Sequence, residues 1–276
     1  MTYSTLMVHL NLGVSNEGLL HIAADLAGRF DAHVIGIAAC QPLQVTYGDG
    51  FMAGDVLEQD RIEMKREIND AEANFRAAFH GRESGLEWRS TIAPSSLATY
   101  IAEQARAADL LIISPEEKGL TRDFSRRVKV GELVMQIARP VLLVPTGINQ
   151  LNLENVVVGW KETGEARRAI SDAIPLLQKA GHVTVVEIAA AEDIAAARDR
   201  LKDVADWLAR HGVAAETVVA HSQGDDAAQL DALAREKDTG LLVAGAYGHS
   251  RVREWMLGGV TRNLMLHPTS CSLVSH

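Results

Sequence analysis

The chain has 276 residues, 47% of them hydrophobic and 23% charged, and a formal net charge of −9 at pH 7. That length suits two domains of about 140 residues better than one. The acidic balance argues against a nucleic-acid partner, because duplex binding depends on Lys and Arg that neutralise phosphates, and no apolar run approaches the roughly 20 residues that span a bilayer.

The compartment is predicted from two further features. The N-terminal stretch MTYSTLMVHLNLGV has neither the basic segment nor the cleavage site of a secretory signal. Cys40 and Cys271 cannot make a disulfide framework, and each lies in an apolar run, so we expect two buried packing residues. We therefore predict a cytoplasmic protein.

Predicted strands and helices alternate along the chain. The first half has apolar runs typical of strands at 6–10, 33–37, 110–114 and 140–144, and helical spacing at 15–30, 56–79 and 97–107. The second half has strand patterns at 156–160, 182–186, 241–245 and 271–274, and helical spacing at 165–180 and 194–211. Strands separated by helices of this length indicate crossover connections and a parallel sheet, with five strands expected in each half.

Several polar residues within these elements are predicted to be structural. The charged run Glu58–Glu72 is expected to form the solvent-exposed face of its helix. The pair Ser95–Ser96 precedes a predicted helix and suits N-caps. His9 and His221 stand at predicted strand ends and are interpreted as structural histidines.

The two halves repeat each other. The two predicted strands near the end of each half recur after 131 residues, whereas the opening strands recur after 150. The first half therefore carries 150 − 131 = 19 extra residues, mainly around Gln41–Asp60. This pattern predicts two domains, 1–148 and 149–276, joined by a polar link at Thr146–Asn155.

A glycine pattern follows the predicted strand at 241–245. Bare glycine amides at a helix N-terminus suit a phosphate group, and ligands of open parallel sheets bind at the carboxyl ends of the strands. The residues predicted to bind a cofactor here are Gly245, Gly248, His249, Arg251, Gly258, Gly259 and Val260.

The spacing of these glycines resembles the universal stress protein motif G-2x-G-9x-G-(S/T), and the resemblance extends through both repeats. It implies two α/β domains, each an open five-stranded parallel sheet in the order 3-2-1-4-5 flanked by helices, like the adenine nucleotide α-hydrolases. It also implies binding of an ATP- or AMP-type nucleotide, and dimer-like pairing of the two domains through their last strands. Two positions depart from the family: Gly259 replaces a Ser or Thr, and Lys161 replaces the Asp found near the adenine.

The first half lacks the glycine pattern. Its corresponding positions are Ser114, Glu117, Arg127 and Val128. Pro115 has no N–H to donate, and Glu116 and Glu117 would repel a phosphate. We therefore predict a structural or regulatory first half that holds no nucleotide in this way.

The leading functional hypothesis is a stress-response protein that binds an adenine nucleotide in its second half, with or without Mg²⁺. It would sense or signal without robust catalysis and show weak ATPase activity at most, because no catalytic base or metal-binding carboxylate is evident in the glycine segment. The alternative is an interaction protein that binds no nucleotide, which Lys161 and Gly259 favour. A nucleotidyl transferase of related architecture is disfavoured, since no SGGxDS loop is present. Whether the chain pairs again into a homodimer stays open.

Overall fold

The computed structural model describes residues 2–42, 53–92, 96–115, 124–246 and 270–276. The first half contains β1 (Thr5–His9), α1 (Glu17–Phe30), β2 (His33–Cys40), α2 (Ala53–Ala78), β3 (Leu86–Ile92), α3 (Leu97–Gln104), β4 (Leu110–Ile113), α4 (Val130–Ile137) and β5 (Val141–Leu143). The second half contains β6 (Asn155–Trp160), α5 (Gly164–Leu177), β7 (His182–Ala189), α6 (Ile194–Arg210), β8 (Ala215–His221), α7 (Asp226–Glu236), β9 (Leu241–Gly245) and β10 (Cys271–Ser275). The predicted elements are therefore present, with small shifts at their ends.

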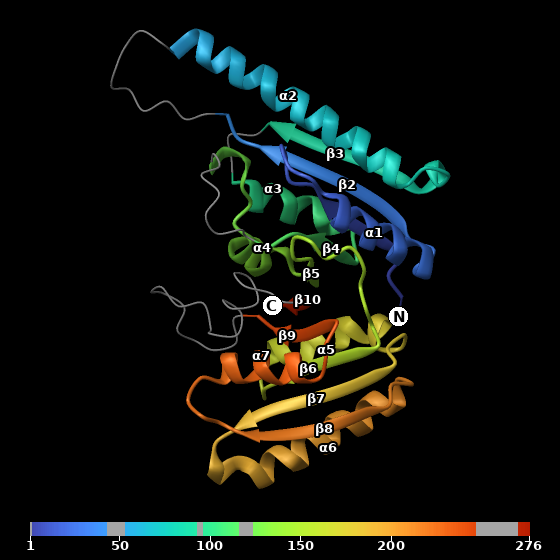
Figure 1. Cartoon of the computed structure of the whole chain (residues 1–276), viewed down its shortest axis with the longest axis vertical. Helices are drawn as coiled ribbons and strands as arrows, with labels where there is room; N and C mark the ends of the chain where they lie inside the picture. The colour runs from blue at the N-terminus through green and yellow to red at the C-terminus, as the bar shows by residue number, and fades with distance from the viewer. Residues whose placement is uncertain (1, 43–52, 93–95, 116–123, 247–269) are drawn as a thin grey trace.

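The strands form one sheet in the order β3-β2-β1-β4-β5-β10-β9-β6-β7-β8 (Figure 1). Within each half the order is 3-2-1-4-5 and every pairing is parallel, as the resemblance implies. The third strand of each half, β3 or β8, lies at an outer edge of the sheet. The two open sheets are thus confirmed, and they join into a single sheet of ten described strands.

The halves meet through their last strands. β5 and β10 pair antiparallel, with Val141 opposite Val274 and Leu143 opposite Ser272. Beside this junction, the Tyr3 hydroxyl donates a 2.6 Å hydrogen bond to the backbone carbonyl of Asp172 on α5. Both chain ends lie near the middle of the elongated molecule (Figure 1). The dimer-like pairing that the resemblance implies therefore occurs within one chain.

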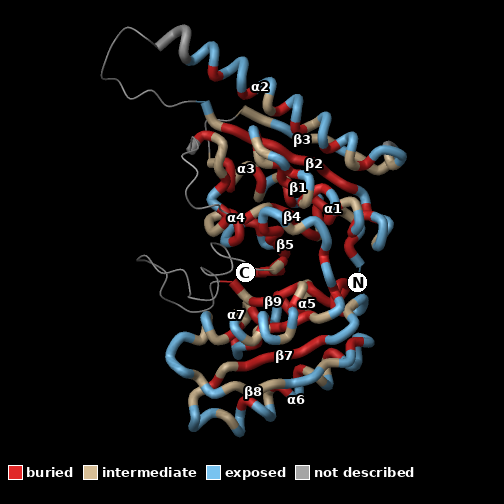
Figure 2. Tube along the Cα trace, in the orientation of Figure 1, coloured by how far each residue is buried: buried red, intermediate tan, exposed pale blue. Residues whose placement is uncertain are grey.

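Helices cover the sheet on both faces, and the buried residues concentrate along the strands between them (Figure 2). One apolar layer lies against α1, α2, α5 and α6, and the other against α3, α4 and α7. Each layer continues across the junction, because Leu142 and Leu273 belong to the first layer and Leu143 and Val274 to the second. Cys40 and Cys271 are free and buried, as predicted.

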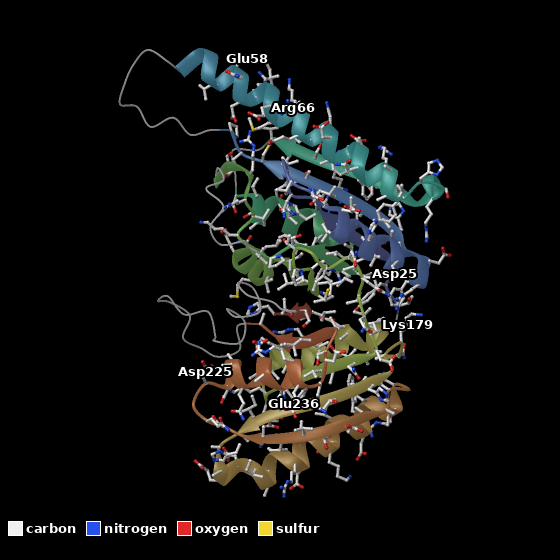
Figure 3. All side chains as sticks on the ribbon, in the orientation of Figure 1. Asp25, Glu58, Arg66, Lys179, Asp225 and Glu236 are labelled. Carbon is white, nitrogen blue, oxygen red and sulfur yellow. The ribbon has the colours of Figure 1, made fainter. Side chains whose placement is uncertain are left out.

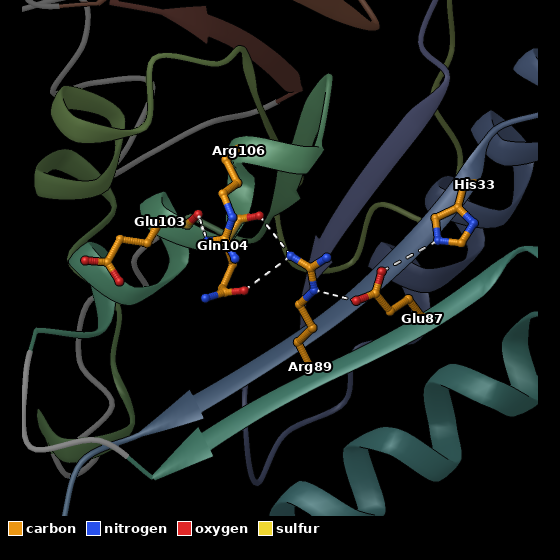
Figure 4. A network of polar contacts seen from close by, with 6 residues as sticks. All are labelled: His33, Glu87, Arg89, Glu103, Gln104 and Arg106. Atoms are coloured by element: carbon orange, nitrogen blue, oxygen red, sulfur yellow. Dashed lines mark hydrogen bonds and ion pairs between the residues drawn. The ribbon is translucent and has the colours of Figure 1, made fainter.

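A polar network attaches the edge strand β3 to its neighbours (Figure 4). Arg89 donates from Nε to Glu87 Oε1 at 2.7 Å and from Nη1 to the Gln104 carbonyl, at the end of α3, at 3.0 Å. The second oxygen of Glu87 lies 3.9 Å from His33 Nε2. The hydrogen bond from Arg89 lowers the pKa of Glu87, so this carboxylate stays ionised. β3 is an edge strand with only one neighbouring strand, and these side-chain contacts attach it further to β2 and α3.

The predicted N-cap role of the serines needs correction. Ser96 occupies the N-cap position of α3 but makes no capping hydrogen bond. Its hydroxyl instead lies 3.2 Å from Glu132 Oε1 on α4. This contact joins the two helices of one layer, so tertiary packing replaces the local cap. Ser95 lies outside the described residues.

Candidate functional site

The candidate site lies at the carboxyl ends of β6 and β9, which are adjacent and parallel. From β6 the chain continues to β7 on one side, whereas from β9 it continues to β10 on the other side, so the strand order reverses between β6 and β9. Open α/β sheets bind ligands in the crevice outside the carboxyl ends of the strands at such a reversal. The glycine pattern begins at this position, because Gly245 is the last residue of β9.

One of the seven predicted site residues falls within the described part of the chain. Gly245 is placed, as stated, at the end of β9. The other six, Gly248, His249, Arg251, Gly258, Gly259 and Val260, lie outside the described residues, so their roles stay predictions.

Gly245 has a structural reason to be glycine that sequence reasoning missed. A Cβ added to it would lie 2.6 Å from the Ala166 backbone nitrogen and 2.7 Å from the Glu165 carbonyl carbon. Both atoms belong to the first turn of α5, so the end of β9 touches the backbone of that helix. A side chain at this position would push the two elements apart, whether or not a ligand binds.

We accordingly expect Gly245→Ala to lower the free energy of unfolding by about 1–3 kcal/mol, because rigid backbone atoms must move to admit the methyl group. Gly164→Ala is the matched control: its Cβ would meet nothing closer than Arg168 Nη1 at 3.8 Å. That variant should change stability by less than about 1 kcal/mol, in the stabilising direction, since alanine favours a helix more than glycine does. Urea denaturation of both variants checks this, and equal stabilities would contradict the close approach.

Two N-terminal amides of α5, those of Glu165 and Ala166, are engaged by side chains of the N-cap and the first turn. Thr163 Oγ1 accepts from the Ala166 N–H at 3.3 Å. The pKa of Glu165 is lowered, first by its carboxylate accepting from its own backbone N–H and further by Thr163 and Arg168. An ionised carboxylate therefore already occupies the positive end of this helix. A phosphate group would have to bind on the β9 side of the crevice instead.

The carboxyl ends of β6 and β7 carry a different set of groups. Trp160 is 8% exposed, and its indole Nε1 has no hydrogen-bond partner among the described residues. Opposite it on β7 stands Glu187, which is 5% exposed and accepts from Arg200 Nη2 of α6 at 2.5 Å. Lys161 follows Trp160 and is exposed. This edge thus presents a lysine where the sequence resemblance implies an Asp.

At the corresponding edge of the first half, polar groups of the loop after β1 form hydrogen bonds with one another. The Asn16 side chain accepts from the Asn11 N–H at 2.9 Å and donates to the Asn11 carbonyl at 2.9 Å. His9 ends β1, is 1% exposed, and has no hydrogen-bond partner for Nδ1 among the described residues. It is buried as a structural histidine would be, whereas His221 at the end of β8 is exposed.

Sequence reasoning missed an ionic cluster at this first-half edge. Arg126 donates from Nη2 to Asp60 Oδ1 at 2.9 Å and from Nε to Glu67 Oε2 at 2.7 Å. The three side chains are 13%, 8% and 14% exposed. The run Glu58–Glu72 is therefore not uniformly a solvent-exposed face, which corrects the prediction: Asp60 is buried and Glu67 is half-buried. We call these three residues, Arg126, Asp60 and Glu67, the first-half triad.

Two negative findings concern the described residues alone. They include no group of three or more His, Cys, Asp or Glu side chains placed to hold a metal ion. None of the described helices combines the length and apolar character needed to cross a membrane.

No protein-family model and no curated protein sequence matches this chain. Among solved structures, a universal stress protein from Archaeoglobus fulgidus DSM 4304 superposes with a TM-score of 0.71 at 13% identity, over 99% of this chain and 98% of that chain. A functionally unknown protein from Pseudomonas aeruginosa PAO1 follows with a TM-score of 0.62 at 16% identity, over 99% and 92%. A universal stress protein from Archaeoglobus fulgidus in complex with dAMP aligns to 51% of this chain and 97% of its own, with 17% identity and a TM-score of 0.33.

The match that spans both full lengths agrees with the two sheets of order 3-2-1-4-5 and their union through β5 and β10. The chain has the tandem fold of the universal stress protein structures.

Proposed function

We propose that this chain is a cytoplasmic stress-response protein that binds one adenine nucleotide, of the ATP or AMP type, in its second half. The observation that carries the proposal is the position of Gly245: the glycine pattern starts at the carboxyl end of β9, beside β6, where the connections diverge. The domain boundary between residues 148 and 149 belongs to the same proposal, and it lies between the end of β5 at Leu143 and the start of β6 at Asn155.

The proposed phosphate contacts come from the β9 side of the crevice. The α5 amides are engaged by Thr163 and Glu165, which leaves the backbone N–H groups of Gly248, Gly258 and Gly259 as the donors. Lys161 is exposed at the end of the neighbouring strand. Its positive charge suits a phosphate, or the metal-free polyphosphate of ATP, better than it suits the adenine ring.

The protein is not expected to catalyse nucleotide hydrolysis robustly. Attack of water on a γ-phosphate needs a positioned base or a metal-binding carboxylate. Two carboxylates follow β6 and both are paired: Glu162 in the loop pairs with Arg167, and Glu165 in the first turn of α5 pairs with Arg168 at 3.5 Å. Weak ATPase activity at most is therefore expected.

A second candidate function is an interaction protein that binds no nucleotide. It is favoured by Lys161, which removes the carboxylate expected near an adenine, and by Gly259, which removes a hydroxyl expected near phosphate. The two candidates differ in a single measurable property, which is the binding of ATP, ADP or AMP by the purified chain.

We expect Gly248→Val to weaken binding of ATP, in the presence of Mg²⁺, by about 5- to 30-fold. A Cβ where the backbone approaches a phosphate, or where φ is positive, should cost about 1–2 kcal/mol. Isothermal titration calorimetry of the wild type and the variant gives the two dissociation constants directly.

Glu192→Ala is the surface control, because Glu192 is exposed in the short turn before α6. Circular dichroism must first show that the Gly248→Val variant is folded. Equal affinities of the wild type and the folded variant would mean that the glycine loop is not the phosphate site. A wild type that binds none of the three nucleotides at millimolar concentration would favour the interaction protein.

A further inference from the structure

Two of the three residues of the first-half triad, Asp60 and Glu67, lie on the inward face of α2. Buried apolar residues at helical spacing, Met64, Ile68, Ala71 and Phe75, form the stripe that packs on the sheet. Asp60 and Glu67 lie on the same stripe, one turn before Met64 and one turn after it. By contrast, Glu58 and Arg66 lie on the outer side of α2 (Figure 3). Two carboxylates in an apolar stripe are costly unless a cation pairs with them.

The cation is Arg126, which comes from a short turn at Phe124–Arg126 rather than from α2. Its guanidinium contacts both carboxylates through different nitrogens, and Nη1 donates to Ser125 Oγ at 3.0 Å. Burial lowers the pKa of Arg126, but the hydrogen bonds to Glu67 and Asp60 outweigh it, so that the pKa is raised. The guanidinium is therefore held as a cation in a site that excludes most of the solvent.

The surroundings of the triad are the carboxyl ends of β1 and β2. A Cβ on Gly13, in the loop after β1, would lie 2.7 Å from Glu67 Oε1. Gln41, which follows β2, donates its backbone N–H to the Ser125 carbonyl at 2.6 Å. Cys40, the last residue of β2, has its pKa raised to about 11, first by burial and further by the two carboxylates against Arg126. The triad thus lies beside the loops after β1 and β2, at the carboxyl-end edge of the sheet, which is the edge at which open α/β folds bind their ligands.

We propose that α2 blocks an oxyanion site in the first half. The carboxylates of Asp60 and Glu67 bind Arg126 at the place where an external oxyanion, such as a phosphate group, would otherwise bind it. Arginine binds carboxylates and phosphates with the same planar set of N–H donors, so a carboxylate can take the place of a phosphate group on a guanidinium. The first half has lost the glycine amides but carries a guanidinium one residue before Arg127, the counterpart of Gly258. Removal of the two carboxylates should therefore expose a latent oxyanion site. This inference does not depend on nucleotide binding in the second half.

The test is a double variant, Asp60→Ala/Glu67→Ala, whose thermal midpoint is measured with and without inorganic phosphate. If phosphate binds beside Arg126 with a dissociation constant of about 5 mM, then about 50 mM phosphate should raise the midpoint by about 3–5 °C. Sodium chloride at equal ionic strength should not reproduce the rise. Wild type should respond by less than about 1 °C, since its own carboxylates fill the site.

Two further variants test whether the rise in thermal midpoint comes from phosphate bound at Arg126. Glu58→Ala/Glu63→Ala removes the same charge from the exposed face of α2 and should behave as wild type. Adding Arg126→Met to the double variant should abolish the response to phosphate, because the guanidinium is gone. If the double variant does not fold, Glu67→Ala alone keeps one carboxylate and should give a smaller rise of the same sign. A folded variant whose response to phosphate equals that of the control would overturn the proposal.

Discussion

Arg126→Met should lower the free energy of unfolding by about 3–5 kcal/mol, one of the largest effects expected of a single substitution in this chain. The methionine fills most of the space of the arginine stem but removes the cation that Asp60, which is buried, and Glu67, which is half-buried, both contact. Removing one partner from a buried ionic cluster costs more than the cluster contributes, because the orphaned charges stay desolvated. Urea denaturation at pH 7 measures the loss.

The matched control is Arg66→Met on the outer side of α2. Its side chain is 70% exposed and lies 3.7 Å from Glu63, a geometry worth less than about 0.5 kcal/mol. The triple variant Asp60→Leu/Glu67→Met/Arg126→Met should recover most of the stability, since apolar residues of similar size can replace a buried ionic cluster. An Arg126→Met variant as stable as Arg66→Met would show that the triad is not buried as described.

The second large effect is a loss of stability in mild acid caused by His9. Burial lowers the pKa of His9 from 6.5 to about 4 in the folded chain, whereas the unfolded chain keeps the ordinary value. Between these pH values the unfolded state binds more protons, so the free energy of unfolding decreases as pH falls from about 6.5 to 4. The full contribution of this one residue is about 3 kcal/mol.

His9→Leu isolates this contribution, because leucine is of similar size and does not titrate. The difference in free energy of unfolding between His9→Leu and wild type should grow in favour of the variant as pH falls from 7 to 4. His80→Leu, at an exposed position after α2, should follow wild type over the same range. A constant difference between His9→Leu and wild type would mean that His9 is protonated equally in the folded and unfolded chains.

Among the strands, the sequence patterns located those that are buried along most of their length better than those that are not. β2 and β7 are almost wholly buried, so their apolar runs identified them. β3 and β8 contain only half-buried and exposed residues; β3 was not located individually, and β8 was indicated only by its end at His221. As edge strands they have one neighbour each, and it is pairing with β2 or β7, rather than their own composition, that makes them strands.

The candidate site was predicted to the same limited extent. The glycine spacing indicated the position after β9, and Gly245 does end that strand. Its contact with the first turn of α5 could not be read from the glycines, because it depends on how closely two elements approach. The predicted emptiness of the first half rested on Pro115, Glu116 and Glu117, the last two of which lie outside the described residues. The first-half triad, which lies beside the loops after β1 and β2, was not foreseen.

The sequence by itself determined the repeat, the alternation of strands and helices, and the place of the glycine pattern, because each is a pattern along the chain that requires no knowledge of contacts in space. Tertiary structure decided which distant groups meet. Arg126 reaches Glu67 and Asp60 across 59 and 66 residues, and β5, in the middle of the chain, pairs with β10 near its carboxyl end. The sequence assigned Asp60 and Glu67 to the solvent-exposed face of their helix, and only the packing of α2 on the sheet placed both carboxylates inward against Arg126.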